Sequence, residues 1–429
     1  MRGLSVLAAV IAFRGFTLID GTGAPAVPDA LLVIADGRVL YAGAATPEAL
    51  GAVPAGVRAA SVAGKWVVPG LVDAHVHAES DADLRQMLRW GVTAVRLMAE
   101  DVALAQDLAR RAARPGSGMP DVFPSAPIFT VKGGWWGRGE PPDANLDRFP
   151  ATPDAARSAV RKAKALGALE IKLMLDDMAW CRAPLPALPR VDPAVARALL
   201  EEAGGQGLRA IVHAPGLAEA EEALGDGATA LAHGVLEPIR DEAIREMKRR
   251  SIFYVPTLDL FEFLADTQRF VEGVLADATV TAPGGLPEET VAKLRAAGYA
   301  AGYRERYPNF ANVERRLPAL RENLRRLHDG GVPVALGTDM WAFPGLAVSV
   351  EMDLFVRAGL TPLEALRAAT QTAARSLAID AEYGTLERGR RADFLVLDRD
   401  PLADVRNLRH ISAVYKLGER VVTGSPQDR

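Results

Sequence analysis

The hydrophobic and polar positions follow two different patterns along the chain. Near the amino terminus, short apolar runs are separated by turn-forming residues, and Asp36-Gly37 between two of the runs is a strong signal for a β-hairpin. These runs predict strands at 13–20, 30–35 and 39–42. The same pattern returns after Gly384, and there the expected strands are 392–397 and 411–417.

Between these ends, short apolar runs alternate with segments of helical spacing. Eight of the runs are predicted strands, at 67–77, 93–98, 122–130, 169–175, 208–213, 228–233, 252–257 and 332–338. The expected helices are 81–90, 102–113, 153–166, 193–203, 348–358 and 362–378. Eight strands that alternate with helices are typical of a (β/α)8 TIM barrel, so we expect an α/β protein of that fold.

Local signals refine this arrangement. Asp192 and Thr361 are expected N-caps, because each precedes a proline at the first helical position. Residues 258–308 are poorly patterned and are interpreted as helical insertions that form a lid, although Pro283-Gly284-Gly285 excludes one continuous helix. Since strands recur at both chain ends, we expect the ends to pair in a small β-sandwich-like domain. The expected division of the chain is an amino-terminal part of the β domain at 1–65, the barrel at 66–383 and a carboxy-terminal part of the β domain at 384–429.

Composition limits the classes of partner. The chain has 429 residues, more than one ordinary core usually holds, and a formal net charge of −4 with dispersed basic residues. We therefore expect a small-molecule substrate, neither a nucleic acid nor a membrane as partner, and a homo-oligomer. The single cysteine, Cys181, excludes an intrachain disulfide framework and fits a reducing compartment.

The first residues allow two interpretations. Arg2 followed by apolar residues 4–12 has the outline of a short signal peptide, which would make the protein exported. Residues 11–20 fit a first strand equally well, and cleavage after Ala12 would cut into it. We favour the strand, no signal peptide and a cytoplasmic protein.

His75 and His77 end the first predicted strand of the barrel. Residues two apart on a strand project from the same face, and two converging imidazoles are a good start for a zinc site. A histidine pair on a solvated strand face is the alternative. The later strands favour the metal site, because functional side chains of such barrels lie at the carboxyl ends of strands. The further candidates at strand ends are Lys172, His213, His233 and Asp339.

Histidines with a carboxylate suit Zn²⁺, Mn²⁺ or Co²⁺, whereas an all-oxygen site would favour Mg²⁺ or Ca²⁺. A bound metal lowers the pKa of its water to around 7, and Asp339 could accept the proton of that water. The alternatives are a surface position for Lys172 and buried structural roles for His213 and His233. His328 and His410 are interpreted as surface residues.

Several motifs together carry a family resemblance. They are Pro69-Gly70-Leu71-Val72-Asp73-Ala74-His75-Val76-His77, Ile171-Lys172, His213-Ala214, Ala232-His233-Gly234, Gly337-Thr338-Asp339, Gly389-Arg390-Arg391-Ala392-Asp393-Phe394 and Asp400-Pro401-Leu402. In this order they resemble the amidohydrolase superfamily, in the branch of imidazolonepropionase-like and Xaa-Pro dipeptidase-like proteins.

The resemblance implies two divalent metal ions, with zinc favoured and manganese, cobalt or iron as alternatives. His75, His77 and Asp339 would bind the more buried ion, and His213 and His233 the second. Lys172 would be carboxylated by CO2 to a carbamate that bridges both ions.

The loops depart from the dipeptidase-like pattern. Where those relatives tend to carry Gly-Gly-His after the third strand, this chain has Gly133-Gly134-Trp135-Trp136, and tryptophan cannot replace an imidazole as an acceptor. Prolidase-type recognition is therefore not expected. The aromatic residues near strand ends predict either an aromatic-lined pocket or simple loop packing, and they are Trp135, Trp136, Tyr254, Trp341 and Phe343. Arg138 is a candidate for binding a substrate carboxylate, or else a solvated loop residue.

These residues favour a metal-dependent hydrolase of an amide, peptide-like or cyclic amide C–N bond. In the expected mechanism a metal-bound hydroxide attacks the carbonyl, the second metal polarises its oxygen, and Asp339 shuttles the proton. A deaminase is the first alternative, although His213-Ala214-Pro215-Gly216 lacks the glutamate of the His-x-x-Glu motif that one-metal deaminases typically carry. Carbamate, ester or phosphoester hydrolysis uses the same cluster. Pyridoxal phosphate on Lys172 would leave four histidines unexplained, and retention of six ligands argues against an inactive scaffold.

Overall fold

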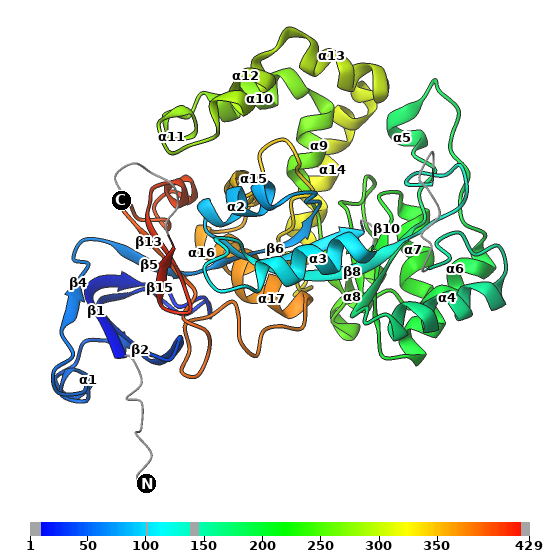
Figure 1. Cartoon of the computed structure of the whole chain (residues 1–429). Helices are drawn as coiled ribbons and strands as arrows, with labels where there is room; N and C mark the ends of the chain where they lie inside the picture. Colours follow the sequence, from blue (N-terminus) through cyan, green and yellow to red (C-terminus); the bar gives the residue numbers. More distant parts are fainter. Residues whose placement is uncertain (1–9, 100–101, 138–145, 422–429) are drawn as a thin grey trace.

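The computed structural model describes residues 10–99, 102–137 and 146–421. Two sheets organise them (Figure 1): one is built from the chain ends, and the other is a parallel sheet surrounded by helices. The expected α/β class is confirmed. None of the helices in these ranges is both long and apolar enough to cross a membrane.

The parallel sheet contains seven of the eight expected strands. Its order follows the sequence, and every neighbouring pair is parallel: β6 (Leu71–Val76), β7 (Val92–Ala99), β8 (Asp121–Phe129), β9 (Glu170–Met174), β10 (Arg209–His213), β11 (Ala230–Ala232) and β12 (Phe253–Val255). Strands buried on both faces need apolar residues at successive positions, which is why they were visible as short apolar runs. Their carboxyl ends meet at one edge and bring the candidate residues together.

The expected eighth strand, 332–338, forms only an isolated bridge between Val334 and Tyr254. Its backbone nevertheless bonds on two sides. Pro333 O accepts from Tyr254 N of β12 at 3.0 Å, while Leu336 O accepts from Ala74 N of β6 at 2.9 Å. A regular ladder between this segment and β12 is interrupted because Pro333 has no N–H to donate. Gly337 lies close to both edge strands, since a Cβ there would lie 2.6 Å from Val255 Cγ1 and 2.8 Å from His75 Cβ.

The first predicted strand of the barrel, 67–77, is two strands in the structure. β5 (Trp66–Pro69) belongs to the sheet of the chain ends, and β6 begins one residue later. Gly70 joins them at a crowded point, where a Cβ would lie 2.2 Å from Thr93 Oγ1. The prediction of one continuous strand is therefore wrong, because the chain passes here from one sheet to the other.

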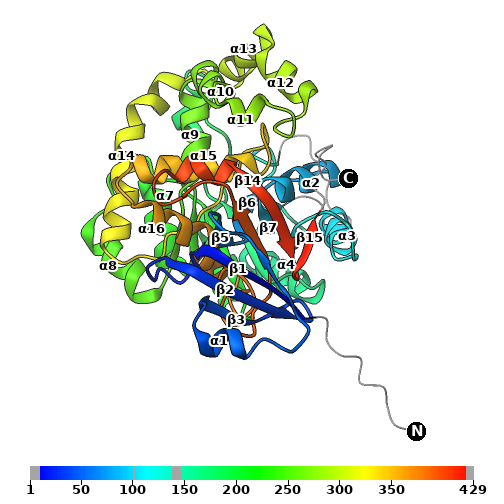
Figure 2. The same cartoon turned by 90° about the vertical axis from the view of Figure 1, so that its left-hand side faces the viewer.

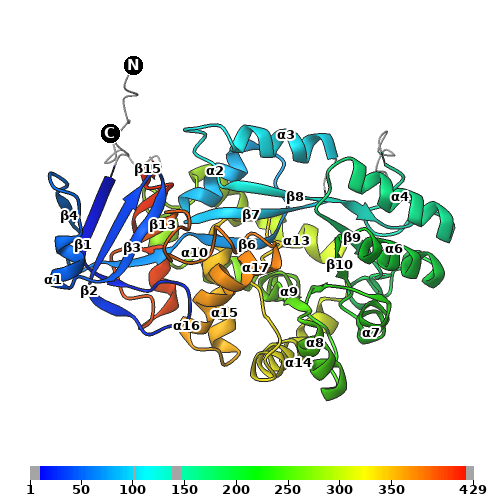
Figure 3. The same ribbon diagram turned by 90° about the horizontal axis from the view of Figure 1, so that it is seen from below.

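The sheet of the chain ends has the order β15-β14-β13-β5-β1-β2-β3, with β4 paired to β1. Its strands are β1 (Val10–Leu18), β2 (Val27–Ala35), β3 (Arg38–Ala44), β4 (Ala59–Ser61), β13 (Phe394–Leu397), β14 (Ile411–Lys416) and β15 (Glu419–Val421), with β5 between them. Figures 2 and 3 show the blue amino-terminal strands beside the red carboxy-terminal ones. The hairpin at Asp36-Gly37 is confirmed, with both residues at positive φ. The sandwich-like packing and the boundaries at residues 65 and 384 stay predictions.

The helices agree with the sequence at their starts. Asp192 accepts a hydrogen bond from Ala194 N, and Thr361 forms a capping box with Glu364. The expected helix 362–378 is divided by a π-helical turn. The helices outside the insertion are α1 (Pro47–Gly51), α2 (Asp81–Arg89), α3 (Val102–Ala112), α4 (Pro153–Ala165), α5 (Ala179–Arg182), α6 (Pro193–Gly205), α7 (Leu217–Asp226), α8 (Asp241–Arg250), α14 (Phe310–Asp329), α15 (Leu346–Arg357), α16 (Pro362–Arg367), η1 (Ala368–Thr372), α17 (Ala373–Ser376) and the 3-10 turn η2 (Val405–Arg409).

The insertion is helical and interrupted, as expected. It contains α9 (Leu258–Ala265), α10 (Thr267–Leu275), α11 (Ala278–Thr281), α12 (Glu288–Arg295) and α13 (Ala297–Arg306). Gly284, at a φ of 97°, lies in the turn between α11 and α12. In Figure 1 these helices extend above the body of the molecule.

Candidate metal centre

β6 brings His75 and His77 to the edge where the parallel strands end. Asp73, two residues earlier, ties this strand to the segment that carries Asp339. Its Oδ1 accepts from His75 N at 3.0 Å and from Thr338 N at 3.1 Å, and its Oδ2 accepts from Thr338 Oγ1 at 2.7 Å. Asp339 N in turn donates to His75 O at 2.8 Å. The carboxylate of Asp339 is therefore fixed beside the histidine pair.

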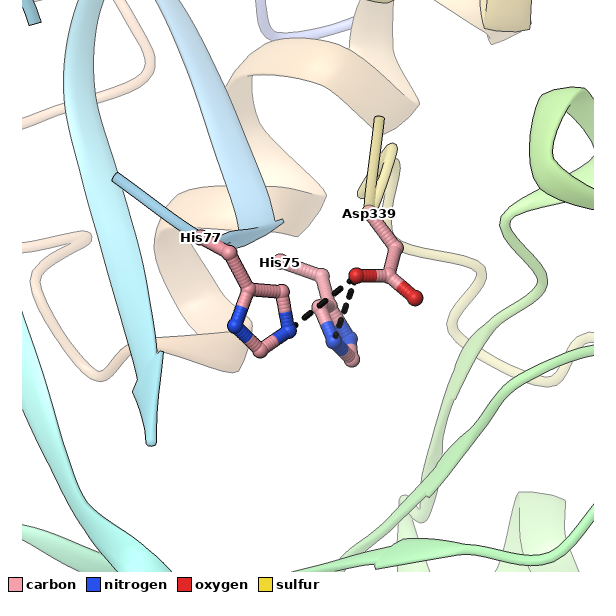
Figure 4. Close-up of side chains that lie close together, drawn as sticks. All are labelled: His75, His77 and Asp339. Atoms are coloured by element: carbon pink, nitrogen blue, oxygen red, sulfur yellow. Dashed lines mark ion pairs between the residues drawn. The ribbon is translucent and has the colours of Figure 1, made fainter. Parts of the chain in front are cut away.

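The three side chains converge on one point (Figure 4). Asp339 Oδ1 lies 3.1 Å from His77 Nε2 and 3.7 Å from His75 Nε2. One ligand atom from each of the three residues lies within 4.8 Å of the others. This spacing and these donor types are suitable for a divalent transition metal.

His213 and His233 join the same cluster from β10 and from the residue after β11. His233 Nδ1 lies 3.7 Å from Asp339 Oδ2 and 2.9 Å from Thr257 Oγ1. The ring centroid of His233 lies 4.6 Å from that of His75 and 4.5 Å from that of His213. Lys172, from β9, lines the same cavity. All six residues expected from the sequence therefore meet at one place.

A cavity of about 290 Å³ opens over this cluster, and much of its wall is aromatic. Trp136 stacks on His77 with ring centroids 5.3 Å apart, and Trp135 packs edge-on against Trp136 at 6.3 Å. Trp341 is 40% exposed, and its Nε1 donates to Tyr303 at 2.7 Å. These three tryptophans line the cavity, which is one of the two alternatives that the sequence left open.

Two other expected aromatic residues lie elsewhere. Tyr254 is fully buried in the middle of β12, and its hydroxyl accepts from Val235 N at 3.0 Å. Its neighbour Val255 belongs to the inner core of the parallel sheet, and successive strand residues point to opposite faces. Phe343 is buried and stacks on Phe270 at 6.1 Å. Tyr254 and Phe343 are therefore not among the residues that line the cavity, and Arg138 lies outside the described residues.

The helical insertion supplies cavity residues that the sequence pattern did not reveal. The cavity-lining residues from α9 and from the end of α13 are Leu260, Phe261, Leu264, Tyr303, Arg306 and Tyr307. The last three are spaced i, i+3 and i+4, so they share one helix face. This spacing was present in the sequence, but nothing in it indicated that the face would turn toward a site carried by other strands.

The family model of the amidohydrolase family matches residues 66–421. This chain belongs to the amidohydrolase family. Ochratoxinase of Aspergillus niger is 29% identical over 298 residues, which is 68% of this chain and 53% of that enzyme. The chain thus spans about half the length of this curated relative.

An imidazolonepropionase of Methylobacterium sp. (strain 4-46) is 27% identical and matches over 94% of each chain. A crystal structure of a Xaa-Pro dipeptidase with bound methionine aligns with a TM-score of 0.74 at 20% identity, over 96% of this chain and 99% of that one. At this identity the structural likeness establishes a shared fold alone.

Burial sets the charge of the cluster in this amidohydrolase. Desolvation lowers the pKa of His213, and it lowers those of His75 and His233 well below the usual value, so these imidazoles are neutral. Lys172 is 2% exposed, and burial lowers the pKa of its amine to about 7. Within the described ranges, Lys172 Nζ and His75 Nδ1 are buried and have no hydrogen-bond partner.

Asp176, two residues after the end of β9, was not among the expected site residues. Its Oδ2 accepts from His213 Nε2 at 3.2 Å and from Trp180 Nε1 at 2.7 Å, and its Oδ1 accepts from Met178 N at 2.9 Å. Burial acts to raise the pKa of this carboxyl, but the bonds from His213 and Trp180 outweigh it and lower the pKa. Asp176 is therefore an ionised acceptor that holds His213 in one orientation.

Proposed function

We propose that this amidohydrolase hydrolyses an amide, peptide-like or cyclic amide C–N bond with two divalent metal ions, preferably zinc. The proposed ligands are His75, His77, Lys172, His213, His233 and Asp339. The observation that carries the proposal is their convergence at the floor of one cavity, from strands far apart in the sequence. Family membership and the names of the relatives, ochratoxinase and imidazolonepropionase, support C–N bond hydrolysis.

The residues present fit two metal ions. Neutral imidazoles offer lone pairs, and the Nε2 atoms of His75 and His77 both face Oδ1 of Asp339. Two neighbouring cations would also need an anionic ligand, and Lys172 could supply one. An amine whose pKa is about 7 is about half unprotonated at pH 7, a far larger neutral fraction than an ordinary lysine has. Its nitrogen can attack CO2 and lose a proton, and the product is an anionic carbamate with two oxygen ligands.

Bound ions of this kind lower the pKa of water to around 7 and polarise a carbonyl. The chain supplies the remaining functions. Asp339, placed by the Asp73 and Thr338 bonds, accepts the proton of the attacking water and returns it to the leaving nitrogen. Asp176 accepts the Nε2 proton of His213 and leaves Nδ1 free as the ligand atom. Trp136, stacked on His77, shields the centre from bulk water.

We also propose that the segment 332–338 completes the (β/α)8 barrel. Its hydrogen bonds to Tyr254 of β12 on one side and to Ala74 of β6 on the other support this. Ester, carbamate and phosphoester substrates are compatible with the same cluster. The tryptophan-lined wall favours substrates with an apolar or aromatic group.

Metal analysis and a hydrolysis panel test the proposal. We expect about two equivalents of zinc in the purified protein, and turnover of at least one class among N-acyl amino acids, dipeptides and cyclic amides. Lys172→Ala should lose one equivalent of metal and at least roughly 100-fold in kcat. His328→Ala, which changes a histidine on α14 paired with Glu364, is the matched control and should lose neither.

Near-zero metal in active protein would contradict the proposed chemistry. Full activity and full metal content in Lys172→Ala would contradict the carbamate specifically.

A further inference from the structure

Arg306 is the cationic side chain that the helical insertion brings to the cavity. Apart from Lys172 at the floor, it is the only lysine or arginine among the described residues that line the cavity. It lies at the end of α13, on the helix face that also carries Tyr303 and Tyr307. Lys172 is already assigned to the metal centre, so Arg306 is the available cation in the wall.

Aromatic contacts hold Arg306 in place. Its guanidinium carbon lies 5.2 Å from the centroid of the Trp135 ring and 5.5 Å from that of Tyr307. The helix itself is fixed to the rim, because Tyr303 stacks on Trp341 at 6.1 Å and accepts its Nε1–H. A guanidinium that lies over aromatic rings keeps its N–H groups free at the edges.

No carboxylate of the described residues pairs with Arg306. Its partners among the described residues are the two rings. By contrast, Arg321 pairs with Glu262, and Arg409 pairs with Asp277 at 2.6 Å. Five donors in a planar fork match the two oxygens of a carboxylate. A lone guanidinium beside a cavity therefore offers a site for a monoanion.

A continuous row of rings connects this site to the metal centre. Arg306 lies over Trp135, Trp135 contacts Trp136 at 6.3 Å, and Trp136 stacks on His77 at 5.3 Å. A ligand that lies along this row would place an aromatic or apolar body against the tryptophans. Its anionic group would reach Arg306 while its scissile bond lies at the histidines.

We propose that Arg306 binds a substrate carboxylate and selects acidic substrates, namely amides with an apolar or aromatic body and one carboxylate. This inference rests on the proposed amide hydrolysis. It assigns to α13 the role that the sequence analysis gave to Arg138.

Two ligands that share the same amide and ring, and differ only in the carboxylate, test whether Arg306 binds that carboxylate. N-acetyl-L-phenylalanine carries the carboxylate, and N-acetylphenethylamine lacks it. Because Arg306 is exposed, calorimetric titration of the zinc-loaded protein should show tighter binding of the acid by roughly 2- to 5-fold, the range for an ion pair with an exposed arginine. Arg306→Met should abolish this preference and leave binding of the neutral ligand unchanged, while Arg306→Lys should restore part of it.

Arg304→Met is the matched control. Arg304 lies on the same helix but over the Phe310 ring, at 4.9 Å, and it does not line the cavity. This variant should keep the preference. For a panel amide that is turned over, Arg306→Met should raise KM for the acid and leave kcat nearly unchanged, which a merely structural role would not do.

The inference is overturned if Arg306→Met loses the same binding affinity for both ligands, or if the unmodified protein binds the acid no more tightly than the neutral ligand. Hydrolysis without a carboxylate preference would refute the role of Arg306 and leave the proposed function standing. An Arg306-dependent preference without hydrolysis of any panel amide would refute the proposed function instead.

Discussion

At the scale of single residues, the proposed metal centre depends on side chains that are not themselves proposed ligands. Asp73 fixes Asp339 through Thr338, and Asp176 fixes His213 through its Nε2. A histidine ring without such a partner can rotate and change its tautomer, which weakens its bond to a metal. We therefore expect metal binding to depend on Asp73 and Asp176 as well as on the histidines.

Asp176→Asn tests this role. The amide is a poorer acceptor than a carboxylate for the Nε2–H of His213, so we expect a roughly 10- to 100-fold weaker hold on one metal ion. Competition with a chromogenic chelator measures the affinity. Asp177→Asn is the control, since the side chain of Asp177 accepts from Ala179 N and makes no hydrogen bond with His213 in the part of the chain that the structure describes. Equal affinities in the two variants would show that Asp176 does not orient the ligand.

At the scale of elements, a buried carboxyl joins the insertion to the body. Glu351 of α15 accepts from Leu258 N at 2.8 Å and from Asp259 N at 2.7 Å, at the start of α9. These are first-turn N–H groups that the helix cannot satisfy internally. Burial raises the pKa of Glu351 to about 8, and it also raises the pKa of Asp259 beside it.

This shift predicts a pH dependence of stability. As pH rises, the unfolded chain loses the Glu351 proton near pH 4.5, whereas the folded protein keeps it until about pH 8. The stability that proton binding at Glu351 adds to the folded state is therefore complete below about pH 4.5 and is lost as pH rises through about 8. Relative to Glu351→Gln, the unmodified protein should lose up to about 1.4 kcal/mol of unfolding free energy per pH unit in this window.

Denaturant unfolding at several pH values between 5 and 8 measures the difference. Glu289→Gln, an exposed position of α12, should give a curve parallel to that of the unmodified protein. A parallel curve for Glu351→Gln as well would show that Glu351 titrates normally.

At the scale of the whole molecule, strands from both chain ends form one sheet. β13 pairs with β5 and connects the carboxy-terminal strands to β1, β2 and β3. Phe394 lies at this junction, fully buried, stacked on Tyr415 at 4.4 Å and edge-on to Phe13 at 5.5 Å. The two ends of the chain thus share one small core. A homo-oligomeric state and a cytoplasmic location stay predictions.

Phe394→Ala should lower the free energy of unfolding by about 3–5 kcal/mol, because it leaves a cavity where both chain ends pack. Thermal or denaturant unfolding measures the loss. Leu40→Ala, at a position of β3 that is 43% exposed, should change stability by less than about 0.5 kcal/mol. A small effect of Phe394→Ala would mean that the two ends do not depend on each other.

The sequence by itself determined most of the elements and the set of candidate ligands. Strand and helix positions follow from local spacing, and caps such as Asp192 and Thr361 act within a few residues. The six proposed ligands were identifiable because parallel strands share an edge, so a residue type repeated at strand ends implies convergence. These are consequences of short-range geometry and of one topological rule.

Tertiary structure decided the rest. Val67 to His77 divides at Gly70 because two sheets meet there, and Tyr254 turns from the cavity because the register of β12 gives Val255 the inner face. Asp176 meets His213, and Arg306 meets Trp135, across long separations in the chain. Such contacts depend on how elements pack rather than on the spacing within them, so no local pattern encodes them.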